Sequence, residues 1–160
     1  MQGFVLKAPG LHDHSRMVRV IFPALVRHST LRESKVLIVE GVHRTTGMAY
    51  TEVGDGLAVV LIHGWACDRG FWRKQIEALS GVCRVVAPDL RGHGASSVPE
   101  DDYSLGRLAG DIYSLCHDLG AAPFVLVGHS IGGMVAQRYA LDHPYGPSGP
   151  CVRGYGRCRP

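Results

Sequence analysis

The sequence predicts an α/β domain, a three-layer αβα sandwich with a mostly parallel sheet. Three short, almost wholly apolar runs recur in the middle of the chain, and each is followed by a loop and then by a helical pattern. Strands that are buried on both faces of a parallel sheet have this apolar character. Their alternation with helices implies right-handed crossovers and helices on both faces of the sheet. A length of 160 residues favours one domain with its own core.

The predicted sheet begins with an antiparallel hairpin. Its two extended segments are KVLIVEGV (35–42) and GMAYTEVGDG (47–56), with a turn around Thr46-Gly47 between them. The apolar runs supply the next strands: LAVVLI (57–62), CRVVAP (83–88) and FVLVG (124–128). Five strands are therefore expected.

Two amphipathic helices are predicted between the apolar runs. The first spans about Asp68 to Ser80, with Asp68 as its N-cap. The second begins at a Ser104 cap and stops at Gly120. Each has one apolar stripe to bury against the sheet. The stripes consist of Trp72, Ile76 and Leu79 in the first helix, and of Leu105, Leu108, Ile112, Leu115 and Leu119 in the second.

Charge divides the chain into three parts. The leader (1–34) has five basic and two acidic side chains, and the Gly, Pro and Arg-rich tail (145–160) has three basic and no acidic ones, so each carries +3. The patterned middle (35–144) has nine basic and twelve acidic side chains, and carries −3. We expect the leader to be poorly ordered and the tail to be irregular. Because the basic charge belongs to the flanks, nucleic-acid binding by the folded part is not indicated.

Cysteine usage and hydropathy bear on the compartment. The chain has five cysteines, an odd number without C-x-x-C spacing, which favours neither a disulfide framework nor a zinc site. A reducing compartment is indicated, and we expect the cytoplasm. No run approaches the roughly 18 apolar residues that a membrane span needs, so no membrane association is expected.

The segment LVGHSIGGM places a serine, Ser130, where a strand turns sharply into a helix. A serine hydroxyl is a weak nucleophile at neutral pH, and such a turn holds it exposed in a strained backbone conformation. Strand and helix approach closely only where small residues flank the turn, and Gly128, Gly132 and Gly133 meet this need. The N–H of Ile131, at the start of the helix, is placed to bind an oxyanion.

A second oxyanion donor is expected from the segment LIHGWACD. A buried strand ends there at His63-Gly64, and the N–H of Trp65 can turn toward the same point. The loss of one such donor typically costs about 2.7–4 kcal/mol of transition-state stabilisation. The Trp65 side chain is expected to flank the substrate pocket, and Cys67 to be a structural thiol. Phe71 and Trp72 could line the substrate pocket too, but a role in helix packing is the simpler interpretation. Met134 is expected on the buried face of the helix that follows Ser130.

The middle of the chain resembles the N-terminal half of an α/β-hydrolase fold protein of the serine esterase and lactonase type. Three blocks carry the likeness over about residues 35–144: HGW after the third strand, DLRGHGASS after the fourth and GHSIGG after the fifth. The resemblance implies a partial α/β-hydrolase fold. It also implies that Ser130 is the nucleophile and that the Trp65 and Ile131 amides form the oxyanion hole. Asp89, Gly92 and Gly94 would belong to a structural turn beside the site.

In this family the acid and the histidine of the triad follow the nucleophile on later loops. The residues after Pro144 contain no apolar run apart from Val152, so no further buried strand is predicted there. This change of composition predicts a chain that is truncated or frameshifted after Pro144 and lacks both partners. His129 is expected to pack beside the turn, pointing away from the reacting side, and His63 and His93 to support loops. Asp89 is expected to hold the turn that follows it.

The expected function is a serine hydrolase that acts on a small-molecule ester or related carbonyl substrate, with little turnover by the chain as it stands. The alternative is a non-catalytic module that self-associates through an exposed sheet edge, the FVLVG strand. Phosphate or nucleotide binding is weakly supported, because no Lys-Ser/Thr follows GHSIGG and GDG does not open a helix. No metal and no organic cofactor is implied.

Overall fold

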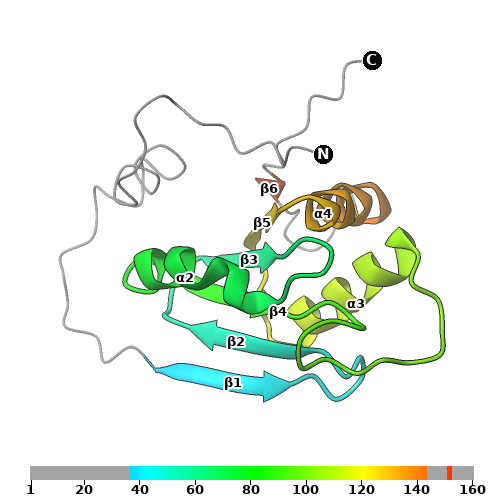
Figure 1. Ribbon diagram of the computed structural model, residues 1–160. Coiled ribbons are helices and arrows are strands. Elements are labelled where there is room, and N and C mark those ends of the chain that lie inside the picture. Colours follow the sequence, from blue (N-terminus) through cyan, green and yellow to red (C-terminus); the bar gives the residue numbers. More distant parts are fainter. Residues whose placement is uncertain (1–36, 144–150, 153–160) are drawn as a thin grey trace, which may run out of the picture.

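The computed structural model describes residues 37–143 and 151–152, and these form one sheet with helices on both faces (Figure 1). The strand order is β1-β2-β4-β3-β5-β6. The pairs β1/β2 and β2/β4 are antiparallel, and β3/β4, β3/β5 and β5/β6 are parallel. The strands are β1 Ile38–Val42, β2 Ala49–Val53, β3 Ala58–Ile62, β4 Arg84–Pro88, β5 Phe124–Gly128 and β6 Cys151–Val152. The predicted hairpin and the parallel centre are confirmed.

The helices lie where the apolar periodicity predicts them. The first consists of a 3-10 turn, η1 (Arg69–Trp72), that continues as α2 (Arg73–Leu79), with the Asp68 side chain accepting the Gly70 N–H at 2.7 Å. The tighter first turn is a common way to begin a helix after a short loop. The other two helices are α3 (Leu105–Asp118) and α4 (Ile131–Asp142). Ser104 caps α3 as expected, by accepting the Arg107 N–H at 3.2 Å.

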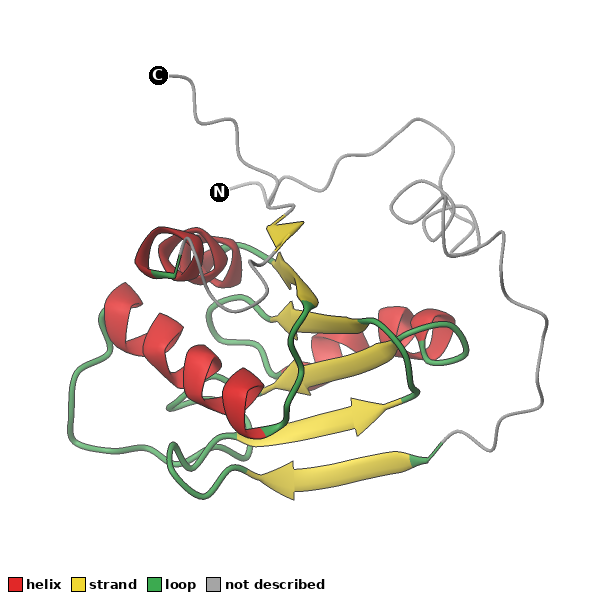
Figure 2. Ribbon diagram, turned by 180° about the vertical axis from the view of Figure 1, so that it is seen from behind, coloured by secondary structure: helices red, strands yellow, loops and turns green. Residues whose placement is uncertain are grey.

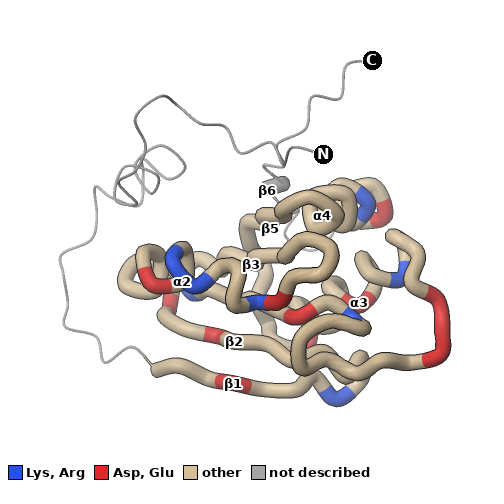
Figure 3. The backbone as a smooth tube through the Cα atoms, viewed as in Figure 1, with Lys and Arg blue, Asp and Glu red and all other residues tan. Residues whose placement is uncertain are grey.

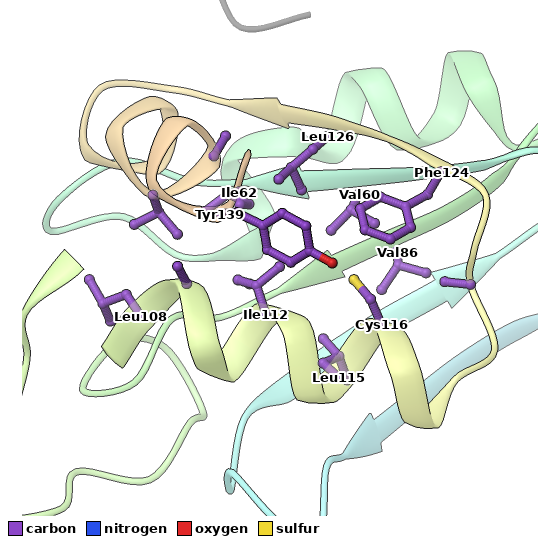
Figure 4. Close-up of a cluster of buried hydrophobic side chains, with 14 of the residues drawn as sticks. Val60, Ile62, Val86, Leu108, Ile112, Leu115, Cys116, Phe124, Leu126 and Tyr139 are labelled. Carbon is purple, nitrogen blue, oxygen red and sulfur yellow. The ribbon is translucent and has the colours of Figure 1, made fainter. Parts of the chain in front are cut away.

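Helices cover both faces of the sheet (Figure 2). The two faces bury separate cores, and neighbouring residues of β3 contribute to opposite ones. Val60 and Ile62 pack toward α3 and α4, in the cluster that Figure 4 shows around Ile112, Leu115 and Tyr139. Val59 and Leu61 pack instead with Trp72 and Leu79, beneath η1 and α2. Every residue of β3 is buried, and its side chains are apolar on both faces of the sheet, as expected for a strand at the centre of a sandwich.

The tail contributes a two-residue strand to the sheet, where no further buried strand was expected. Cys151 and Val152 pair in parallel with Val125 and Leu126, so β6 covers part of the outer edge of β5. Two backbone residues can join a sheet edge without the long apolar run that a buried strand needs. The other expectations for the leader and the tail fall outside the described residues.

Charged residues of both signs are interspersed along the described trace (Figure 3). No helix in this part of the chain combines the length and the apolar character that a bilayer crossing requires.

Candidate active site

Ser130 occupies the turn between β5 and α4, at the carboxyl end of the parallel strands (Figure 1). Its backbone has φ 54° and ψ −119°, and Ala66 is the other described non-glycine residue with positive φ. Positive φ is uncommon for a residue with a Cβ and persists where the surroundings impose it. The sequence motif therefore folds into the strained, exposed turn expected for it.

The glycines around Ser130 are required by close backbone contacts. A Cβ on Gly128 would lie 2.2 Å from the Gly132 carbonyl carbon and oxygen, and one on Gly132 would lie 2.4 Å from the Ile62 oxygen and 2.5 Å from the His63 oxygen. A Cβ on Gly133 would lie 3.4 Å from the Gly128 oxygen, which is ordinary contact. The absence of side chains at Gly128 and Gly132 is therefore what allows β5, α4 and the end of β3 to meet at this turn.

Both expected oxyanion donors are free within the described part of the chain. Neither the Ile131 N–H nor the Trp65 N–H donates there to a backbone or side-chain acceptor, whereas the Gly132 and Gly133 amides are bonded to the His129 and Ser130 oxygens. Ile131 is the first residue of the twelve-residue α4. A helix N-terminus carries unpaired N–H groups and partial positive charge, which together favour a developing anion.

His63 is a fully buried, neutral support of the loop after β3. The Leu90 N–H donates to its Nε2 at 2.9 Å, so the ring proton lies on Nδ1, which donates to the Gly64 oxygen at 2.7 Å. Burial lowers the pKa of His63 below its usual range, and the Gly64 contact opposes this only partly. With both ring nitrogens committed, His63 cannot accept a proton from Ser130 without breaking its bond to Leu90.

Asp89 is a buried carboxylate that joins two loops. It accepts the Ala95 N–H at 2.8 Å, which holds the turn after β4 as expected, and the backbone N–H of Arg69 at 2.6 Å. The Arg69 guanidinium also pairs with it. Gly92 and Gly94 adopt φ of 74° and 53°, and a Cβ on Gly94 would overlap Asp89.

A cavity of about 530 Å³ opens beside Arg69 and Asp89, and neither Ser130 nor Trp65 lines it. Acidic and basic side chains both line this space, including Glu40 and Arg73, so its charge favours no single kind of ligand. No cluster of His, Cys, Asp and Glu in the described residues could hold a metal ion.

Aromatic and apolar side chains surround the turn. Trp65 is 64% exposed and packs edge-on against His93, with ring centroids 5.1 Å apart. Phe71 is 44% exposed, stacks on His129 and packs edge-on against Trp72, which is buried as expected. Met134 was also expected to be buried and is 52% exposed. It lies one helical turn after Ser130, on the outer side of α4.

No described histidine near Ser130 has a carboxylate partner. His93 Nδ1 contacts the Arg91 oxygen at 3.0 Å, and His129 Nδ1 is buried without a hydrogen-bond partner. Among the residues of known placement, His–carboxylate contacts under 4 Å occur only at Asp118, with His43 at 2.9 Å and His117 at 3.1 Å. Asp118 ends α3, which leads to the amino end of β5, whereas Ser130 follows the carboxyl end.

A family model described as the alpha/beta hydrolase fold matches residues 58–148, more than half of the chain. The chain belongs to the alpha/beta hydrolase fold family. The match spans β3 to α4 and therefore includes the loop of Trp65, the turn after β4 and the turn of Ser130.

Curated proteins and solved structures resemble part of this chain. The magnesium-chelatase 30 kDa subunit of Rhodobacter capsulatus is 40% identical over 95 residues, which are 59% of this chain and 34% of that protein. The bifunctional epoxide hydrolase 2 of Sus scrofa is 38% identical over 119 residues, 72% of this chain and 21% of that protein. The solved structure of Est816, described as an N-acyl homoserine lactone degrading enzyme, superposes with a TM-score of 0.63 at 31% identity, over 71% of this chain and 42% of that one. The chain thus spans between about a fifth and two fifths of these relatives.

Two contacts at this hydrolase-fold site escape sequence reasoning, those made by Arg69 and by Phe71. Arg69 reaches from η1 to Asp89, and Phe71 reaches the ring of His129 from 58 positions earlier in the chain. Neither contact follows a motif. An arginine and a phenylalanine at a helix start are ordinary, and only the packing of η1 against the Ser130 turn brings them into the site.

Proposed function

We propose that this chain carries the nucleophile and the oxyanion hole of a serine hydrolase for esters or related carbonyl compounds. The observation that carries the proposal is the positive φ of Ser130, held between Gly128 and Gly132 at the N-terminus of α4. Such strain persists only where the surrounding structure imposes it, and it keeps the hydroxyl exposed for attack.

The proposed reaction is acyl transfer. Ser130 Oγ bonds to the carbonyl carbon as its proton leaves to a base, and the carbonyl oxygen becomes an oxyanion that accepts the Trp65 and Ile131 N–H groups. The intermediate collapses to an acyl-serine, and the leaving alcohol takes a proton. Water then hydrolyses the acyl-serine by the same steps and releases the acid.

None of the described histidines near Ser130 is well placed to act as its general base. His63 is committed at both nitrogens, and neither His93 nor His129 contacts a carboxylate within the described residues. A histidine without an orienting carboxylate is a poor general base, and removal of the base erases most of the rate of a serine hydrolase. We therefore propose that the 160-residue chain alone turns substrate over slowly or not at all.

Apolar, uncharged acyl groups suit this site best. Three exposed apolar side chains lie near this turn: Phe71 on the ring of His129, Met134 one helical turn after Ser130, and Trp65 in the loop that carries the second N–H, and none of them carries charge. Burial of apolar surface contributes roughly 25 cal/mol per Å², so an aliphatic or aromatic acyl chain gains affinity there. The relatives include an epoxide hydrolase and a lactone-degrading enzyme, and a serine at the turn favours carbonyl substrates such as the latter's.

Labelling with a fluorophosphonate probe tests the proposal. We expect wild type to be labelled slowly at Ser130, Ser130→Ala not at all, and the control Ser80→Ala, at the end of α2, as wild type. A folded wild-type sample that shows no more labelling than Ser130→Ala would refute the proposed nucleophile. Rapid, sustained hydrolysis of a p-nitrophenyl ester by wild type would instead refute the proposed lack of turnover.

A second candidate is a non-catalytic module that associates through a sheet edge. The FVLVG strand expected as that edge is paired at Val125 and Leu126 by β6. The observation that favours the candidate is instead β1, which ends the described sheet and on which Ile38 and Val42 are 62% and 64% exposed. Such an apolar edge is a template for pairing with another chain. Sedimentation velocity tests it, since the candidate requires a concentration-dependent oligomer that Ile38→Lys weakens, and a monomer at every concentration excludes it.

A further inference from the structure

The ring of His129 lies between the two ends of the loop that follows β3. At the start of the loop, a Cβ on Gly64 would lie 2.8 Å from His129 Nδ1, so the ring occupies the space that a side chain there would fill. At the other end, Phe71 stacks on the same ring, with centroids 4.6 Å apart and an interplanar angle of 29°. One side chain of the Ser130 turn therefore contacts both ends of another loop.

This loop holds one of the two proposed oxyanion donors, and the described side-chain contact of its middle is the edge-on packing of the Trp65 ring against His93. Trp65 and Ala66 are exposed, and Ala66 has φ 56°. The Cys67 N–H bonds to the Gly64 oxygen at 3.3 Å, so the turn closes on Gly64 itself. The Trp65 ring is held by His93, and the backbone on either side of Trp65 is held at Gly64 and Phe71.

The contact is one of packing. His129 Nδ1 is buried and has no hydrogen-bond partner among the described residues, so no directional bond ties the ring to Gly64. Phe71 is in turn packed edge-on against Trp72, which is buried in the core under α2. The ring is therefore braced on one side by the core and on the other by the end of β3.

We propose that His129 is a positioning residue, whose ring clamps the Gly64–Phe71 loop against the Ser130 turn and thereby fixes the Trp65 N–H relative to the Ile131 N–H. The consequence for catalysis rests on the proposed function, whereas the clamp itself does not. Because packing carries the contact, a flat apolar ring can replace the imidazole and a methyl group cannot. Loss of either stacking partner frees the loop, and loss of both adds little.

The test compares His129→Ala, Phe71→Ala, the double variant and the rescue variant His129→Phe, with Leu141→Ala on the outside of α4 as control. Amide 15N relaxation reports the Trp65 and Ala66 N–H vectors whether or not Ser130 reacts. We expect order parameters near 0.85 in wild type, His129→Phe and Leu141→Ala, and below about 0.6 in the three variants without the stack. The Cys67 amide should exchange at least tenfold faster in those three, while the amides of β3 and β5 keep their protection.

Labelling of Ser130 by the fluorophosphonate provides the second readout. We expect the maximal labelling rate to fall about tenfold in His129→Ala and Phe71→Ala, to recover in His129→Phe, and the half-saturating probe concentration to change little. Unchanged order parameters at Trp65 and Ala66 in both alanine variants would overturn the clamp, as would a loosening shared by the whole sheet. If wild type is not labelled, the proposed function fails, and the relaxation data still decide the clamp.

Discussion

Arg91 and Asp111 form a buried ion pair with two hydrogen bonds, Nε to Oδ2 at 2.6 Å and Nη2 to Oδ1 at 3.0 Å. The pair joins the turn after β4 to α3, and the Arg91 side chain is only 2% exposed. Arg91 Nη1 also donates to the backbone carbonyl oxygen of Asp102 at 3.1 Å. Since this turn carries His93, against which Trp65 packs, the pair supports one wall of the candidate site.

We expect Asp111→Asn to destabilise the fold strongly. The substitution leaves the buried Arg91 guanidinium with only the partly exposed Asp101 as a counter-charge, and breaking a buried pair from one side costs about 3–5 kcal/mol. Urea unfolding followed by circular dichroism measures the loss. The matched control is Asp101→Asn, which removes a partly exposed partner of the same arginine and should change the midpoint little. Equal effects of the two variants would contradict this assignment.

The glycine contacts of the Ser130 turn predict a sharp difference between neighbouring positions. Gly132→Ala places a methyl group 2.4–2.5 Å from the Ile62 and His63 oxygens, so backbone must shift, and overpacking of this kind costs about 1–3 kcal/mol. Gly133→Ala meets only ordinary contact at 3.4 Å and should be neutral or slightly stabilising, because alanine favours a helix interior. Thermal unfolding of both variants compares them directly. A Gly133→Ala variant as unstable as Gly132→Ala would mean that the need for glycine comes from α4 itself and not from the close approach of Gly132 to the Ile62 and His63 oxygens.

Periodic patterns made most of the fold predictable from the sequence. The stripe from Leu105 to Leu119, with a capping serine and a stop glycine, requires no tertiary information, and α3 follows it closely. The Ser130 turn was equally predictable, because the close approach of strand and helix there requires glycines on both sides of the serine. Met134 shows the limit, since an apolar residue at helical spacing is exposed when no described element covers that side of α4. The stack of Phe71 on His129 also depends on how two loops pack, which no local pattern encodes.

Cysteine reactivity should separate the described thiols. Cys83 and Cys116 are buried, and burial raises the pKa of Cys116 to about 12, so its reactive thiolate is scarce at neutral pH. Cys67 is partly exposed in the loop beside Trp65. We expect iodoacetamide to modify Cys67 at pH 8 while Cys83 and Cys116 react only after urea is added, as measured by peptide mass spectrometry. Modification of Cys116 at the rate of Cys67 in the folded protein would contradict the burial of α3 against the sheet.

The buried neutral state of His63 predicts that stability falls in mild acid. Burial lowers the pKa of His63 from its ordinary value of 6.5, so near and below that pH the unfolded chain binds a proton that the folded chain does not. The free energy of unfolding therefore decreases as pH falls from about 6.5 toward the lower folded pKa, and the contribution is fully present above 6.5. A proton on Nε2 would also turn this nitrogen into a donor, so it could no longer accept the Leu90 N–H and that buried hydrogen bond would be lost.

The variant His63→Gln isolates this effect from other titrating groups. It should be less stable than wild type at pH 7.5, because an amide replaces the ring bonds to Leu90 and Gly64 imperfectly. The difference should shrink at pH 5.5, where only wild type has lost the contribution of a neutral histidine. Urea unfolding at both pH values measures this, with the less buried His93→Gln as the control. A gap between wild type and His63→Gln that stays constant with pH would show that His63 titrates alike in the folded and unfolded chains.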